Sequence, residues 1–137
     1  MTTIECVVRI SRHTATDSHV AALHSIFGND INIVTKDIAY GDDPVGAVQE
    51  MLQQVKHLKQ GIHAEVDIKA VEAVGPESIV MALVQKLEVP VIRPVFRREN
   101  GRVVIVGKDA NGRDIFDVER YEWLEIENRP TLVGREF

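Results

Sequence analysis

Up to about residue 100, the apolar positions show two patterns in turn: short apolar runs typical of strands, and apolar residues at the spacing of a helix. Short runs rich in Val and Ile predict strands over residues 4–10, 31–38, 66–74 and 89–96. Between them, apolar residues at helical spacing predict three helices: one after residues 11–16, one over about 44–58 and one opened by residues 75–78. Strands that alternate with helices favour right-handed crossovers and a parallel sheet. We therefore expect a layered α/β fold.

The pattern changes in the last third of the chain. Residues 103–106 and 115–126 are extended segments, and Asn111-Gly112 between them is a turn signal. This predicts a C-terminal antiparallel hairpin, over about residues 102–127, appended to the mostly parallel sheet. Pro90 and Pro94 lack amide hydrogens, so we expect the strand that contains them at an edge or a bulge.

Composition is that of one ordinary globular domain. The chain has 137 residues, of which 45% are hydrophobic and 27% charged, so we expect a single domain over residues 1–137. Cys6 is the single cysteine, which excludes an intrachain disulfide and predicts a buried thiol. No signal peptide and no membrane-spanning apolar run is visible, so a cytoplasmic location without membrane contact is expected.

The charge balance limits the partners. There are 16 Lys and Arg against 21 Asp and Glu, a formal charge of -5. Duplex nucleic acid, whose binding depends on phosphate neutralisation, is therefore a poor partner for the surface as a whole. An anion must find a local basic pocket.

Three loops qualify as binding sites, because ligands of open α/β sheets bind outside the carboxyl ends of the strands. The first, residues 11–16, presents the hydroxyl of Ser11, the guanidinium of Arg12 and the imidazole of His13 in succession. Arg12 suits bidentate contact with a phosphate, and His13 suits proton transfer. The alternative is that Ser11 and Thr14 cap the following helix while Arg12 and His13 are solvated.

The other two loops carry weaker signals. In the second loop, residues 39–44, the carboxylates of Asp37, Asp42 and Asp43 around Tyr40 and Gly41 suit a ribose hydroxyl or a metal, although helix capping alone explains Asp43. In residues 75–78, the amides of Glu77 and Ser78 can wrap a phosphate, but the Glu77 carboxylate competes with that anion.

Two further groups of side chains are candidates for ligand or metal binding. Arg93, Arg97 and Arg98 cluster around the predicted strand 89–96 and either add positive charge to a pocket or form a solvated edge that discourages strand pairing. His19 and His24 do not share a helical face, so no metal site is expected. Dinucleotide, P-loop and nucleophile-elbow motifs are absent, so no cofactor is expected either.

Four features together resemble a known family. They are a strand ending in Ser11-Arg12-His13-Thr14, an apolar helix after Gly75, the strand 89–92, and a closing hairpin from residues 102–105 to 116–121. In these features the chain resembles the small CRISPR-associated Rossmann-like proteins that bind or degrade cyclic tetra-adenylate, the ring nucleases of type III systems. The resemblance extends to about residue 126. It implies a Rossmann-like three-layer domain and a homodimer with a two-fold site.

The resemblance also implies a reaction without metal. A ribose 2′-hydroxyl attacks the adjacent phosphorus and leaves a 2′,3′-cyclic phosphate and a 5′-hydroxyl. Ser11, Arg12 and His13 are then the expected catalytic residues. The expected contacts to cyclic tetra-adenylate are Arg12, Thr14, Tyr40, Gly41, Gly75, Ser78, Arg93 and Arg97.

Two other functions stay open on the sequence alone. A protein with the same pocket can sequester the messenger without cutting it, because holding a phosphate needs Arg12 and amides but no proton transfer. Alternatively, an arginine-rich edge docks another protein, and no nucleotide binds.

Overall fold

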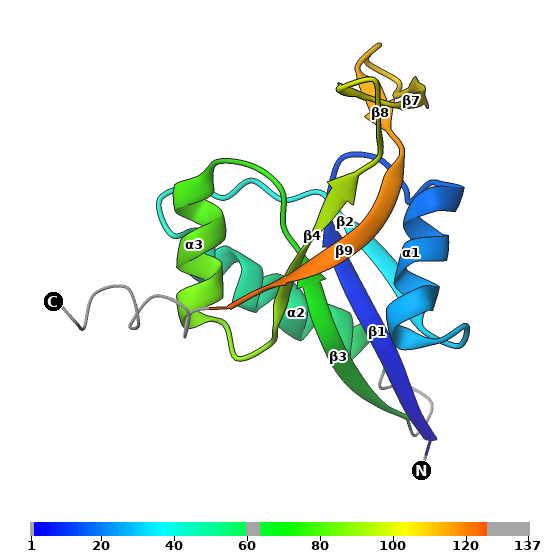
Figure 1. The fold of residues 1–137 in the computed structure, drawn as a ribbon. Coiled ribbons are helices and arrows are strands. Elements are labelled where there is room, and N and C mark those ends of the chain that lie inside the picture. Colours follow the sequence, from blue (N-terminus) through cyan, green and yellow to red (C-terminus); the bar gives the residue numbers. More distant parts are fainter. Residues whose placement is uncertain (1, 60–63, 126–137) are drawn as a thin grey trace, which may run out of the picture.

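A five-stranded sheet forms the centre of the molecule (Figure 1). The computed structural model describes residues 2–59 and 64–125. The strand order is β2-β1-β3-β4-β9, with β1 at Thr2–Ile10, β2 at Asn32–Lys36, β3 at Ala64–Glu72, β4 at Val91–Phe96 and β9 at Val118–Leu124. The first four strands are parallel to their neighbours, and β9 is antiparallel to β4. The prediction of an α/β fold with a mostly parallel sheet is confirmed.

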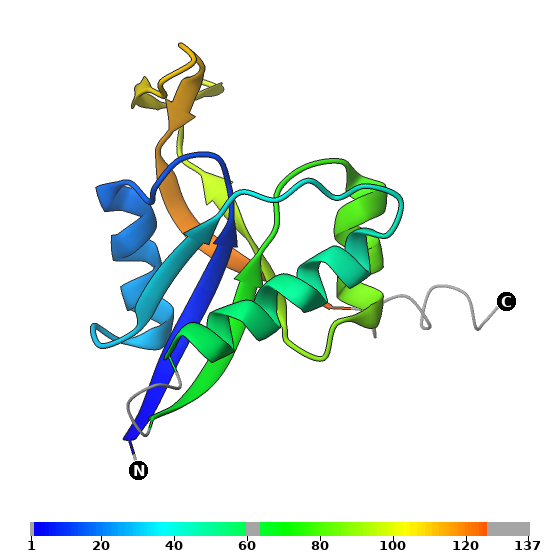
Figure 2. The ribbon, with the colours of Figure 1, turned by 180° about the vertical axis from the view of Figure 1, so that it is seen from behind.

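Helices cover both faces of this sheet. The helix α1 (Asp17–Phe27) packs on one face, and α2 (Pro44–Lys59) and α3 (Glu77–Lys86) pack on the other, which Figure 2 shows from behind. Successive strand residues point to opposite faces. Val7 therefore packs with Leu23 of α1, whereas Val8 packs with Val48 and Leu83 of the other two helices.

Polar side chains set where the first two helices begin. Thr16 caps α1, because its hydroxyl accepts from the amide of His19. Asp43 Oδ1 accepts from the amide of Gly46 at 3.0 Å, as the sequence predicts for α2. The alternative assignment of Ser11 and Thr14 as caps of α1 is wrong, because the helix begins later, at Asp17.

The C-terminal segment differs from the predicted hairpin. The strands β7 (Ile105–Lys108) and β8 (Asp114–Phe116) do pair antiparallel around the turn at Gly112, whose φ of 78° suits glycine. They form a separate two-stranded sheet that projects beyond the carboxyl edge of the main sheet (Figure 1). A second small pair, β5 (Arg98–Glu99) with β6 (Arg102–Val103), precedes it. Residues 126 and 127 of the predicted hairpin lie outside the described residues.

The fifth strand of the sheet is β9, which follows the hairpin. It pairs with β4 along Val91 to Phe96, so β4 is not an edge strand and the edge position predicted from its prolines is wrong. The alternative of a bulge agrees with the structure, because the register with β9 shifts between Val95 and Phe96, next to Pro94. The ladder between β3 and β4 ends at Ile92, before Pro94, so the missing amide of Pro94 leaves no hydrogen bond to β3 unmade. Among the described residues, no helix is long and apolar enough to span a bilayer.

Candidate functional site

Three loops and the β7–β8 hairpin meet at the carboxyl edge of the sheet. They enclose a cavity of about 660 Å³, here called the main cavity. The loop after β1 contributes Ser11, Arg12 and His13, and the loops after β2 and β3 contribute Asp37, Tyr40 and Gly75. The structure thus brings together six of the residues singled out in the sequence. The hairpin adds three charged residues that were not singled out: Asp109, Arg113 and Asp114.

The other predicted contacts lie elsewhere. Thr14 lines an adjoining cavity of about 410 Å³ that it shares with Arg12 and His13. Gly41 and Ser78 do not line the main cavity. Their loops reach it through neighbouring residues instead.

Arg93 and Arg97 are also outside the main cavity, and carboxylates engage both. Arg93 Nε lies 2.7 Å from Glu122 Oε1, and Arg97 Nε lies 2.9 Å from Asp117 Oδ2. Arg93 lines a smaller cavity of about 150 Å³ beside Glu77, whose carboxylate lies 3.4 Å from its Nη1. The positive charge of these two arginines is therefore largely balanced by acidic neighbours.

Arg12 is in the opposite situation. Its side chain is exposed and makes no hydrogen bond or ion pair with any residue that the structure describes. Two of the acidic residues that line the same cavity have other partners: Asp109 Oδ1 accepts from two backbone amides, and Asp114 Oδ1 lies 2.7 Å from Lys108 Nζ. The third, Asp37, forms no ion pair with Arg12. The amide of Arg113, more than any other group, lowers the pKa of Asp109. Arg12 is thus available to an anion that enters the main cavity.

The hydrogen bonds of His13 define which of its ring nitrogens is a base. The ring Nδ1 lies 3.1 Å from the carbonyl oxygen of Thr14. Because a carbonyl oxygen only accepts, Nδ1 carries the proton in this contact. In the neutral imidazole, Nε2 then has its lone pair available, as a general base requires.

A buried polar network beneath the loop after β1 fixes the position of that loop, and the sequence analysis did not predict this network. Arg9, only 1% exposed, places Nε 2.9 Å from Glu72 Oε1, which also accepts from the hydroxyl of Tyr121 at 2.6 Å. The Nη1 of Arg9 donates to the carbonyl oxygen of His13 at 3.2 Å and to Thr35 Oγ1 at 3.0 Å. Burial first, and Glu72 second, raises the pKa of Tyr121. The guanidinium of Arg9 therefore ties β1, β2 and β3 to the loop after β1, and β9 joins the network through the bond from Tyr121 to Glu72.

His19 lies beside this network and is 3% exposed. Its Nδ1 accepts from the amide of Thr16 at 3.2 Å, and its ring centroid is 5.8 Å from that of His13. Burial, followed by the positive charge of Arg9, lowers the pKa of His19 to about 4. The side chain is therefore neutral at physiological pH.

This depressed pKa predicts a pH dependence of stability. The unfolded chain protonates this histidine near pH 6.5 and the folded protein only near pH 4, so the unfolded state binds more protons between these values. Lowering the pH from 7 to 5 should therefore reduce the free energy of unfolding through His19 by about 2 kcal/mol. Urea unfolding at both pH values measures the loss.

His19→Gln isolates this contribution, because Gln at the third helical position preserves the capping box. The variant should lose less stability than the wild type between pH 7 and 5. His57→Gln, at an exposed histidine of α2, is the matched control and should behave like the wild type. Equal pH dependence in the wild type and His19→Gln would contradict the assignment.

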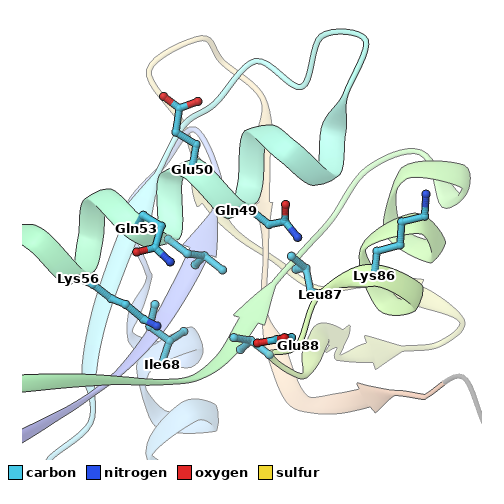
Figure 3. Close-up of a pocket in the computed structure, with 10 residues that line it drawn as sticks. Gln49, Glu50, Gln53, Lys56, Ile68, Lys86, Leu87 and Glu88 are labelled. Carbon is cyan, nitrogen blue, oxygen red and sulfur yellow. The ribbon is translucent and has the colours of Figure 1, made fainter.

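Another cavity, of about 460 Å³, lies between α2 and α3 (Figure 3). Gln49, Gln53 and Lys56 of α2 face Lys86 and Glu88 across it. None of the site residues predicted from the sequence lines this cavity. In the described part of the chain, no group of three or more His, Cys, Asp or Glu side chains is placed to hold a metal ion.

Comparison with known proteins gives no relative for this chain. No family model matches it, and neither the curated proteins nor the solved structures give a match. The geometry of the main cavity and the chemistry of its residues are therefore the basis for assigning a function.

Proposed function

We propose that this chain is a Rossmann-like ring nuclease of type III CRISPR signalling, which binds cyclic tetra-adenylate in the main cavity and opens the ring. The observation that carries the proposal is the loop after β1. It presents Ser11, Arg12 and His13 to a cavity of about 660 Å³, with the guanidinium of Arg12 unpaired among the described residues. An acidic protein with a cation available at this edge of its sheet is suited to a small anionic ligand.

Phosphate recognition falls to Arg12. A guanidinium offers two parallel N–H groups to two phosphate oxygens, which gives both charge and orientation. Ser11 is fixed in a position to contact the same phosphate. Its amide donates to the carbonyl oxygen of Lys36 at 3.0 Å, and its hydroxyl accepts from the amide of His13. The loop is thus fixed at both ends before a ligand arrives, as preorganised electrostatic stabilisation requires.

Ring opening needs a base, a stabilised phosphorane and a leaving group. His13 Nε2 takes the proton of a ribose 2′-hydroxyl, O2′ bonds to the adjacent phosphorus, and the bond from phosphorus to O5′ breaks. O5′ takes up a proton from water, which gives a 5′-hydroxyl and a 2′,3′-cyclic phosphate. Arg12 stabilises the negative charge on the phosphate oxygens in the transition state. This route uses neither a metal nor a cofactor.

The ligand also suggests the assembly. A cyclic tetranucleotide repeats one unit, and a two-fold homodimer presents each loop to it twice. The proposal therefore includes a homodimer in the cytoplasm, where the messenger is made.

A second candidate is sequestration of the messenger without cleavage. His13 is the one histidine that lines the main cavity in the described part of the chain, so within one chain no second imidazole lines this cavity to return a proton to O5′. Binding through Arg12 needs no such group. Turnover therefore distinguishes the two candidates.

Thermal unfolding with added nucleotides tests the proposal. Ligand at 100 times its Kd stabilises the folded state by about 2.7 kcal/mol, which raises Tm by several degrees. We expect this shift with cyclic tetra-adenylate and a smaller one with linear tetra-adenylate or cyclic hexa-adenylate. No shift with any of them would refute nucleotide binding.

Product analysis then separates the two candidates. With ligand in large excess over protein, a ring nuclease should convert many rings per chain to a product with a 2′,3′-cyclic phosphate. Tight binding with the ring recovered intact would instead support sequestration.

A further inference from the structure

A second and smaller cavity opens beside the main cavity. It has a volume of about 240 Å³ and is here called the inner pocket. The two are contiguous, because both are lined by Ile10, Ser11, His13, Val74 and Asp114. The remaining wall is formed by apolar side chains from β4 and β8 together with Arg9, His19 and Glu72. The last three residues are each at most 3% exposed.

The inner pocket is lined mostly by apolar groups, and its charged groups are paired. Arg9 and Glu72 neutralise one another at 2.9 Å, and the carboxylate of Asp114 lies 2.7 Å from Lys108 Nζ. His19 is neutral, because its pKa is about 4. An anionic phosphate therefore gains little here, in contrast to the position of Arg12 in the main cavity.

Two polar atoms in this pocket have no partner among the described residues. His19 Nδ1 accepts from the amide of Thr16, so in the neutral ring the proton is on Nε2, which donates to nothing. Glu72 uses Oε1 for both Arg9 and Tyr121, and no described group donates to Oε2. Buried donors and acceptors are normally paired. The inner pocket thus offers one donor and one acceptor to a ligand.

Aromatic rings supply the rest of the recognition. Phe96 and Phe116 meet edge to face, with ring centroids 5.4 Å apart, and both line the pocket. A volume of about 240 Å³ is below the 300 to 1,000 Å³ typical of a site for a whole small molecule. The pocket therefore suits one flat, uncharged ring system rather than a complete nucleotide.

We propose that the inner pocket binds an adenine base. The Hoogsteen edge of adenine presents an acceptor, N7, and a donor, the N6 amine, which complement His19 Nε2–H and Glu72 Oε2. Guanine presents two acceptors on the same edge, so its O6 would face the carboxylate of Glu72. This inference rests on the proposed function, because it places one base of a nucleotide whose phosphate meets Arg12.

Adenosine is the probe, because it carries the base without a phosphate. Titration of the wild-type protein with adenosine, followed by NMR of the amides and histidine side chains, should give saturable shifts at His19 and Phe116. Guanosine, the matched ligand, should bind at least about tenfold more weakly, because one hydrogen bond is replaced by a repulsion. Equal binding of the two nucleosides, or none of either, would overturn the inference.

Two variants test the residues. Phe116→Ala should weaken adenosine and cyclic tetra-adenylate by about tenfold or more, because stacking on an aromatic ring is lost. His19→Leu should weaken both by about tenfold, since the donor is lost. It also loses the half of the capping box in which His19 Nδ1 accepts from the amide of Thr16. Thr16→Ala loses the other half, the hydroxyl that accepts from the amide of His19, and keeps the imidazole and the amide that donates to it. This variant is the control and should bind both ligands like the wild type.

The outcomes separate this inference from the proposed function. If cyclic tetra-adenylate binds the wild type and both variants equally well, the adenine pocket is wrong and the proposed function stands. If the wild type binds adenosine but not cyclic tetra-adenylate, the pocket stands and the proposed messenger is wrong. If neither ligand binds, both are wrong.

Discussion

Arg12→Ala is expected to weaken the binding of cyclic tetra-adenylate by about 10- to 100-fold, which is the contribution of a hydrogen bond to a charged group. Arg12 lines the main cavity and has no acidic partner among the described residues, so its guanidinium is available to a phosphate. The stability of the free protein should change little, because the side chain is exposed and makes no hydrogen bond or ion pair with any described residue. Isothermal titration calorimetry measures the affinity.

Arg120→Ala is the matched control for charge. Arg120 is an exposed arginine of β9 that does not line the main cavity, and its nearest acidic atom, on Glu119, is 4.0 Å away. Both variants remove one positive charge, but only Arg12→Ala should weaken binding substantially. Equal losses would show that the ligand responds to net charge and not to this loop.

Glu72→Ala is expected to reduce the free energy of unfolding by about 3 to 5 kcal/mol. The variant leaves the guanidinium of Arg9 buried without its carboxylate partner and removes the acceptor of the Tyr121 hydroxyl. A buried charge without a counterion is costly because desolvation is no longer offset. Urea unfolding, followed by circular dichroism, measures the loss.

Asp117→Ala is the comparison, because it breaks an ion pair with the same N···O distance at a more exposed position. Arg97 Nε lies 2.9 Å from Asp117 Oδ2, as Arg9 Nε does from Glu72 Oε1, but Arg97 is 47% exposed in its side chain. Water replaces the lost partner of Arg97, so this variant should cost at most about 1 kcal/mol. Similar losses for the two variants would contradict the structural importance assigned to the buried network.

Local patterns were sufficient to predict the first four strands of the main sheet, the three helices and the loops that form the main cavity. Strand and helix periods are set by neighbouring residues, and alternation of the two places every loop after a parallel strand at the same edge. Ser11, Arg12 and His13 were found for this reason. Their meeting with Tyr40 and Gly75 also follows from the sheet topology.

Contacts between distant segments explain what the sequence did not reveal. Arg9 and Glu72 are cross-strand neighbours because of the register of β1 and β3, and register was not predictable from either strand alone. Arg93 likewise faces Glu122 only because β9 adds to β4. The turn at Gly112 is local and was found, but nothing local states which strand β9 will join.

The cap of α1 shows the same limit on a smaller scale. Ser11, Thr14 and Thr16 each carry a hydroxyl suited to an N-cap. Thr16 is selected because its side chain and that of His19 satisfy one another's backbone amides. Ser11 is thereby left for the loop, where its hydroxyl accepts from His13.

Titration of the ¹⁵N-labelled protein with cyclic tetra-adenylate tests the central claim most directly, because amide shifts report both binding and its place. We predict saturable shifts in residues 10–13, 37–40, 74–76 and 109–114, with little change around Gln49 and Lys86 in the cavity of Figure 3. Absence of saturable shifts, or shifts confined to the cavity between α2 and α3, would contradict the assignment of the main cavity as the binding site.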